Sequence, residues 1–255
     1  MAICKKCFRD LPLQKSHIIP EFFFKYVYSN DHKFTQVAIE NKDDLHTEQK
    51  GWREELFCHD CEEEMSAFEK ITADFFRNLN QSPEKFNPIE ETPNYTYFDC
   101  NIDYLQIKKC LLSILWRASI SSLEEFIDYN LDSDIQDELK NIIFSDLTID
   151  TLCYPIMISR IKMGTMDSCD LIMPWKKGHS DLYNCDIYSF SLAGFQIDIF
   201  MDKELKIPNP DIEKMFLNPT NLFIRNIPFE SLEIKEDLLK RFKDSDVISF
   251  YKKHP

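Results

Sequence analysis

The chain has 255 residues, of which 44% are hydrophobic and 13% aromatic, and its formal net charge at pH 7 is -14. This composition can fill a sizeable core, and the acidic balance argues against a protein that coats nucleic acid with a basic surface. With 4 glycines and neither a GxGxxG nor a Walker A pattern, the sequence also argues against a glycine-rich phosphate-binding loop.

The N-terminus and the apolar segments predict where the protein resides. The opening Met-Ala-Ile-Cys-Lys-Lys lacks the apolar region of a secretory signal, and the apolar run from Cys110 to Trp116 is far shorter than the ~18 residues of a membrane span. We therefore expect a soluble, cytoplasmic protein that does not bind membranes. Its 9 cysteines are then expected to be metal ligands and free thiols rather than disulfides.

The first eighty residues are expected to form several short elements ahead of one long helix. Residues 4–19 are typical of a zinc knuckle followed by a short β-hairpin, and Pro20 suits the first position of a helix that reaches residue 28. Residues 33–40 alternate like a strand, and 41–51 form a polar loop. Apolar residues recur at helical spacing over 59–79, which predicts a long helix.

A proline-rich segment, 80–94, predicts a domain boundary because Pro83, Pro88 and Pro93 exclude a helix there. After it we expect a strand at 95–98, a helix at 103–120, a helix that begins at the capping-box pattern Ser121 to Glu124, and a helix at 132–144. The two parts are then 1–80 and 81–255.

The pattern changes to period two after residue 148. Strands are expected at 152–163, 169–173, 186–192 and 195–201, with Gly164 and Gly194 at turns, which predicts an antiparallel sheet. A last helix is expected at 232–251.

Two CxxC pairs are the most specific signal in the sequence. Cys4 and Cys7 lie in a knuckle, and Cys58 and Cys61 lie on one face at the start of the long helix. Four thiolates form a closed tetrahedral structural zinc site. A knuckle, a hairpin and a helix with the second pair make the treble-clef arrangement. The other five cysteines have no ligand spacing and are expected in the core.

His17 and the acidic start of the long helix are less specific functional signals than the two CxxC pairs. A histidine at this position is equally compatible with a surface residue, a core residue or an alternative zinc ligand. The run Glu62, Glu63, Glu64 is also what a solvated helix N-terminus favours, because carboxylates there interact well with the helix dipole.

The order of these motifs resembles the HNH (ββα-metal) endonucleases, and is closest to their zinc-supported bacterial members. The resemblance rests on Cys4-x-x-Cys7, His17-Ile-x-Pro20 and Cys58-x-x-Cys61, and covers residues 4 to about 76. It implies that His17 is the general base, that Mg²⁺ or Mn²⁺ stabilises the leaving oxygen, and that DNA is the substrate. Bacterial defence, including phage defence, or a mobile-element system is the setting that the family implies.

The sequence departs from that family at two positions. Ser16 stands where the family often has Asp or another ligand, and Glu62 stands where it often has His. A carboxylate suits Mg²⁺, and Glu69 shares a helix face with Glu62, so both are expected metal ligands and catalytic residues; His59 is an alternative. The bracing asparagine of the family corresponds to Asn30 or Asn41.

Further basic residues have several open roles. Lys15 and Arg53 are candidates for contact with nucleic acid. Arg117 is expected to extend to solvent, to pair with an acidic neighbour or to contact phosphate, and His179 is expected in an exposed hairpin loop.

The sequence therefore predicts an α+β protein with an N-terminal zinc-bound treble-clef HNH-like module, followed by helices and an antiparallel sheet of unknown role. The expected function is a metal-dependent DNA endonuclease. The alternative is a non-catalytic zinc module that binds a protein partner or nucleic acid. The acidic body suits docking to a basic protein partner or an activating subunit.

Overall fold

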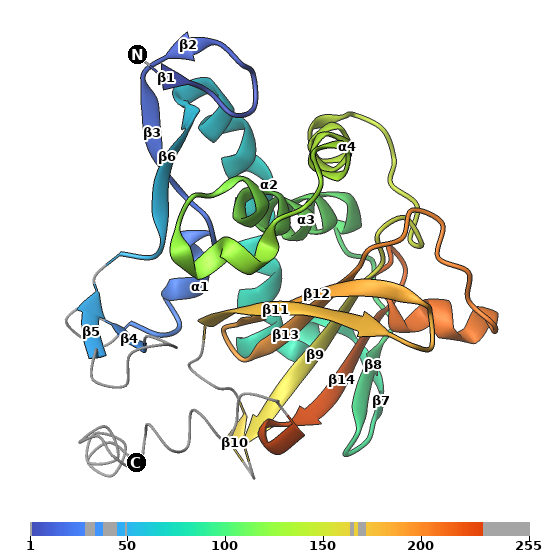
Figure 1. Cartoon of the computed structure of the whole chain (residues 1–255). Helices are drawn as coiled ribbons and strands as arrows, with labels where there is room; N and C mark the ends of the chain where they lie inside the picture. The colour runs from blue at the N-terminus through green and yellow to red at the C-terminus, as the bar shows by residue number, and fades with distance from the viewer. Residues whose placement is uncertain are drawn as a thin grey trace.

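The protein is a mixed α/β structure in which helices cover one face of a long sheet (Figure 1). The computed structural model describes residues 2–28, 34–37, 45–48, 50–163, 166–167 and 172–231. Among the described residues, no helix is long and apolar enough to cross a membrane. The helix expected at 232–251, the turn at Gly164, the first residues of the strand expected at 169–173, and Asn30 and Asn41 lie outside the described residues.

The N-terminal strands pair differently from expectation. β1 (Ala2–Ile3) pairs with β2 (Asp10–Leu11) around the knuckle, but β3 (Leu13–His17) pairs with the distant β6 (Arg53–Cys58), so the hairpin is not confined to residues 4–19. β6 buries Leu56, Phe57 and Cys58 at its end, and this apolar content gives β3 a partner that anchors it to the core. The first half of β6 is polar, and the sequence pattern therefore did not predict this strand.

Between these strands lie a short helix and a second hairpin. α1 (Glu21–Phe24) follows Pro20 as predicted, but it ends four residues before the expected limit at residue 28. β4 (Phe34–Val37) pairs with β5 (Leu45–Glu48), so the segment 41–51, expected as a loop, contains a strand.

The long helix is confirmed as α2 (His59–Gln81). Cys58 is the residue before it, in an extended conformation, and the helix stops ahead of Pro83, whose ring cannot continue the hydrogen-bond pattern. The proline-rich segment is not a bare linker, because it forms a 3-10 turn, η1 (Pro83–Phe86), and an edge strand, β7 (Pro88–Glu91), before β8 (Tyr95–Phe98).

The middle helices agree with expectation except at the capping box. α3 (Tyr104–Ile120) and α4 (Ser133–Phe144) are confirmed. The helix expected from Ser121 is instead a 3-10 helix, η2 (Glu124–Tyr129), and Leu123 precedes it without a side-chain cap. The hydroxyl groups of Ser121 and Ser122 donate to Glu54 of β6 at 2.7 Å, and the Ser121 hydroxyl also accepts the backbone N–H of Leu123 at 3.2 Å.

The sheet is antiparallel except at one junction. Its order is β11-β12-β13-β9-β14-β8-β7, and β10 (Met166–Asp167) pairs with β9. Its remaining strands are β9 (Ile156–Met163), β11 (Ile172–Ser180), β12 (Cys185–Leu192), β13 (Phe195–Phe200) and β14 (Leu222–Pro228). The sequence did not predict β14, which runs parallel to β9 after the turn η3 (Pro210–Met215) and leads into η4 (Phe229–Ser231). Gly194, with φ of 88°, lies in the tight β12–β13 turn as expected.

One buried core joins the two parts that the sequence divides at residue 80. Phe57 of β6 stacks on Trp116 of α3 with ring centroids 5.4 Å apart. Phe76 of α2 lies 5.3 Å from Phe195 of β13. The N-terminal module is therefore packed against α3 and the sheet, so residues of α3 lie within reach of its functional groups.

Candidate metal centre and adjoining histidine cluster

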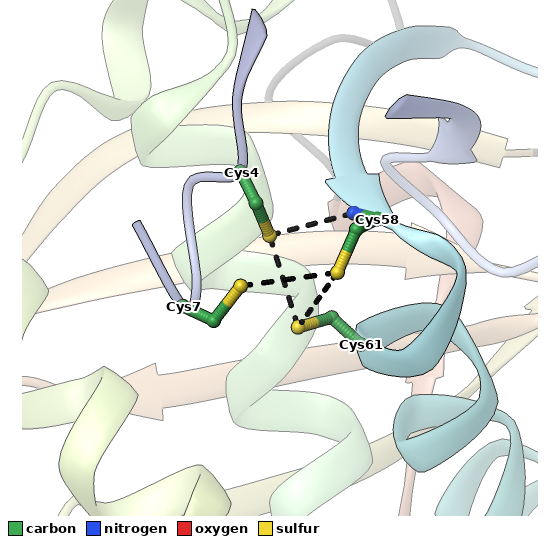
Figure 2. Close-up of side chains that lie close together, drawn as sticks. All are labelled: Cys4, Cys7, Cys58 and Cys61. Atoms are coloured by element: carbon green, nitrogen blue, oxygen red, sulfur yellow. Dashed lines mark hydrogen bonds between the residues drawn. The ribbon is translucent and has the colours of Figure 1, made fainter. Parts of the chain in front are cut away.

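The four cysteines of the two CxxC pairs converge at one point (Figure 2). Their sulfur atoms all lie within 4.8 Å of one another. The Sγ–Sγ distances are 3.7 Å for Cys4–Cys61, 3.8 Å for Cys7–Cys58 and 3.5 Å for Cys58–Cys61. The knuckle supplies one pair, and the junction of β6 with α2 supplies the other.

These distances fit a tetrahedral metal ion. With Zn–S bonds of about 2.3 Å, the sulfurs of a regular tetrahedron lie about 3.8 Å apart. Disulfide bonding would require about 2.05 Å, so the cysteines are placed as ligands and not as bonded pairs. The four residues can therefore hold one zinc ion, as the sequence predicted, and four thiolates leave no position open for a reacting water.

Neighbouring groups support thiolates in this cluster. The Arg9 side chain donates to Cys7 Sγ at 3.3 Å, and this hydrogen bond is the main reason that the pKa of Cys7 falls to about 6. The backbone N–H of Cys58 donates to Cys4 Sγ at 3.4 Å. Burial raises the pKa of Cys61, so its thiolate depends on the metal for its stability.

The remaining described cysteines lie apart from this cluster. Cys100, Cys110, Cys153 and Cys185 are free thiols. Cys110 and Cys185 are buried, as expected for core residues, whereas Cys100 and Cys153 are only half-buried. Cys169 lies outside the described residues.

His17 occupies the end of β3, and its side chain is 22% exposed. It is not one of the clustered metal ligands among the described residues. Its Nε2 lies 3.6 Å from a carboxylate oxygen of Glu21. Burial lowers the pKa of His17 to about 4; Glu21 opposes this change, and the cations Arg53, Arg117 and Lys50 add to it. The imidazole is therefore neutral at pH 7, and the same burial makes it a weaker proton acceptor than an ordinary histidine.

Glu62 lies one residue beyond Cys61, the last cysteine of the cluster, on the first turn of α2. Burial raises the pKa of its carboxyl group, and hydrogen bonding with the Ser16 side chain opposes this effect. Within the part of the chain that the structure describes, the buried oxygen Oε1 of Glu62 has no hydrogen-bond partner. An unpaired buried carboxylate oxygen is costly unless a cation or water binds it.

Arg117 was the residue least expected at this place. It comes from α3, its side chain is 2% exposed, and its Nη1 donates to Glu69 Oε1 at 2.8 Å and to the His17 backbone carbonyl at 2.9 Å. Pairing with an acidic neighbour was one of the roles left open for it. No local spacing signals this contact, because His17 and Arg117 are 100 residues apart.

The other residues predicted from the sequence lie on the β3–β6 ladder and at the exposed start of α2. Arg53 pairs in register with His17 in the β3–β6 ladder, while Lys15 is exposed and lies opposite Glu55. Glu63 and His59 form an exposed pair at 3.4 Å, and Glu64 pairs with Lys6, as expected for a solvated helix start.

His179 departs from expectation, because it lies within β11 and not in a loop. It is 48% exposed, as predicted, and lies 3.2 Å from Asp186.

Comparisons with protein-family profiles, with curated proteins and with solved structures gave no match for this chain. Functional assignment therefore rests on the geometry of the zinc-type cluster and of the adjoining group His17, Ser16, Glu62, Glu69 and Arg117, which we call the histidine cluster.

Proposed function

We propose that the protein is a metal-dependent HNH-type endonuclease that hydrolyses phosphodiester bonds of DNA. The observation that carries this proposal is the convergence of β3 and the start of α2 beside the four cysteines. Ser16 interacts with Glu62, and Arg117 connects the strand at His17 with the helix at Glu69. A general base and a free carboxylate oxygen thus belong to two adjoining elements of one module.

In this mechanism His17 is the general base. The neutral imidazole takes a proton from a water molecule, whose oxygen attacks phosphorus. The bond from phosphorus to the leaving oxygen breaks, and this oxygen takes up a proton from solvent, which gives a phosphate monoester and a hydroxyl group. Glu21, near Nε2, stabilises the imidazolium that forms.

Glu62 is the first choice for holding Mg²⁺ or Mn²⁺. Its Oε1 is free of hydrogen bonds within the described chain, and hard cations prefer such oxygens. When bound, the ion supplies positive charge for the leaving oxygen. Glu69 is a weaker choice than the sequence suggested, because its carboxylate already pairs with Arg117.

Lys15 and Arg53 remain our candidates for the DNA backbone, since both lie on the β3–β6 ladder that carries His17. The net charge of -14 would limit non-specific DNA binding. A basic protein partner or activating subunit, and a role in phage defence, stay part of this proposal.

A second function is favoured by a separate observation. Both His17 and Glu69 already have protein partners, Glu21 and Arg117, and Ser16 is a poor metal ligand. These contacts favour a non-catalytic zinc module that binds a protein partner or nucleic acid.

A plasmid-nicking assay with Mg²⁺ or Mn²⁺ separates the two functions. We expect the wild type to nick the plasmid and His17→Ala to lose on the order of 10²-fold or more in rate, at equal zinc content. His179→Ala is the matched control, since that histidine is exposed on β11. Equal cleavage by wild type and His17→Ala would exclude His17 as the base, and absence of cleavage by all three proteins would favour the binding module.

A further inference from the structure

Arg117 is the one member of the histidine cluster that comes from outside the N-terminal module. It lies near the end of α3, and its side chain is almost fully buried at 2% exposure. A buried guanidinium is stable only when its donors have partners. The hydrogen-bond partners of Arg117 therefore indicate its role.

The guanidinium is first fixed to its own helix. Nε donates to the Ser113 backbone carbonyl at 3.2 Å, and Nη2 donates to Ser113 Oγ at 3.0 Å. Ser113 is itself fully buried, and its hydroxyl donates to the carbonyl of Cys110. These bonds leave Nη1 as the nitrogen that projects toward the module.

Nη1 then joins two elements that the proposed chemistry requires to be in register. It donates to the His17 carbonyl at the end of β3 and to the Glu69 carboxylate on α2. Glu69 is two helical turns beyond Glu62 on the same face, so the strand with the base and the helix with the metal ligand meet at one nitrogen.

The charge of the pair supports the same role. Glu69 is 25% exposed and carries the charge that compensates the buried guanidinium. Removing one partner of such a pair costs more than the pair itself contributes, so the two are expected to stay together when substrate binds.

From this geometry we propose that Arg117 is a positioning residue of the proposed nuclease site, which sets the His17 imidazole relative to Glu62 by holding the His17 carbonyl and Glu69 together. Glu69 is then the anchor of Arg117 and not a ligand of the divalent ion. This inference rests on the proposed endonuclease function. In this role Arg117 acts through its two partners and not through the attacking water or the phosphate.

The substitution Arg117→Lys tests this role while keeping the positive charge. One ammonium nitrogen cannot reproduce the planar fork that reaches Ser113, His17 and Glu69 together. A misplacement of about 1 Å in an active site costs about 10²-fold, so we expect kcat to fall by roughly 10- to 100-fold with KM for plasmid DNA unchanged. Zinc content should be unaffected, because Arg117 contacts none of the four cysteines.

The matched control is Arg160→Lys. Arg160 also joins two elements, since it donates from β9 to the Leu79 carbonyl of α2 at 2.9 Å, but it does so at the other end of α2. Arg160→Lys should lower the thermal unfolding midpoint to an extent similar to that of Arg117→Lys, while leaving kcat unchanged. Ser113→Ala is a milder variant that loosens the guanidinium without removing it, and it should lower kcat by a few-fold.

The experiment measures kcat and KM for plasmid cleavage, zinc content, Mn²⁺ affinity and thermal unfolding for all four proteins. Support for the inference is a lower kcat in Arg117→Lys and Ser113→Ala with Mn²⁺ affinity unchanged and Arg160→Lys at wild-type rate. Wild-type kcat in Arg117→Lys, or in Ser113→Ala if the lysine variant does not fold, overturns the inference and leaves the nuclease proposal standing. A weaker Mn²⁺ affinity in Arg117→Lys also overturns it, and a wild type that cleaves no DNA overturns both.

Discussion

The cysteine cluster and the histidine cluster adjoin each other, yet they are built in opposite ways. The first uses four identical ligands from two local pairs, and its sulfurs already lie at the spacing of a zinc tetrahedron. The second combines five side chains of four chemical types from β3, α2 and α3. One of them, Arg117, is 100 residues from the strand it contacts.

This difference separates what local spacing can specify from what tertiary packing must supply. A CxxC pair brings two sulfurs together through a few backbone angles, so two pairs define a metal centre almost by themselves. The histidine cluster depends on the core that packs β6 against α3, through Phe57 and Trp116. A change can therefore disturb one cluster and spare the other.

The largest expected effect comes from breaking the cysteine cluster. Cys61→Ser removes a ligand, and structural zinc sites contribute roughly 10–16 kcal/mol in small zinc-binding peptides. We expect loss of stoichiometric zinc and a large drop in the thermal unfolding midpoint, measured by metal analysis and calorimetry. Cys100→Ser, at a half-buried thiol outside the cluster, is the control. Full zinc content in Cys61→Ser would contradict the assignment.

The next effect should appear in the histidine cluster alone. Glu62→Gln keeps the shape of the side chain but removes the negative charge that, in our proposal, binds the divalent ion. We expect plasmid nicking to fall by on the order of 10²-fold and Mn²⁺ affinity to weaken, while zinc content stays at the wild-type level. Glu63→Gln, at the exposed neighbouring position, should match the wild type in all three measurements. Unchanged Mn²⁺ affinity in Glu62→Gln would remove this residue from the metal site.

Sequence patterns predicted the cysteine centre and most helices because these depend on local chemistry. α2, α3 and α4 have apolar faces at helical spacing, and the four ligands lie at fixed separations. β6 and β14 were missed, since their pairing with β3 and β9 is decided by long-range packing. The sequence left open that Arg117 pairs with an acidic neighbour, but it could not identify Glu69 as that partner for the same reason, and so it favoured Glu69 as a metal ligand where the structure gives it a protein partner.

A smaller effect should follow from adding a methyl group at Gly51, which lies next to the backbone hydrogen bond between Trp52 and Ile18. A Cβ atom added at Gly51 would lie 2.2 Å from the Phe24 ring, and the neighbouring Trp52 carbonyl accepts the Ile18 backbone N–H at 2.9 Å. Gly51→Ala should therefore cost ~1–3 kcal/mol of unfolding free energy and shift His17, with zinc content intact. Chemical denaturation measures the first change. Gly178→Ala, where the nearest atom lies 3.9 Å away, serves as the tolerated comparison.

The smallest effect is the pH dependence that His17 adds to stability. Its pKa is about 4 in the folded protein, chiefly because of burial, against the usual 6.5, so the unfolded chain takes up a proton first as the pH falls. The ionisation of His17 should leave the unfolding free energy unchanged above pH ~6.5 and lower it as the pH falls from ~6.5 to ~4. Below pH ~4 it should cause no further change. The loss should be on the order of 1 kcal/mol, because solvent reaches part of the ring. His17→Gln lacks this ionisation, so the difference in unfolding free energy between it and the wild type should slope in this window. A difference that stays constant from pH 4 to 7 would mean that burial does not hold His17 neutral, and the imidazole would then be half-protonated near its ordinary pKa.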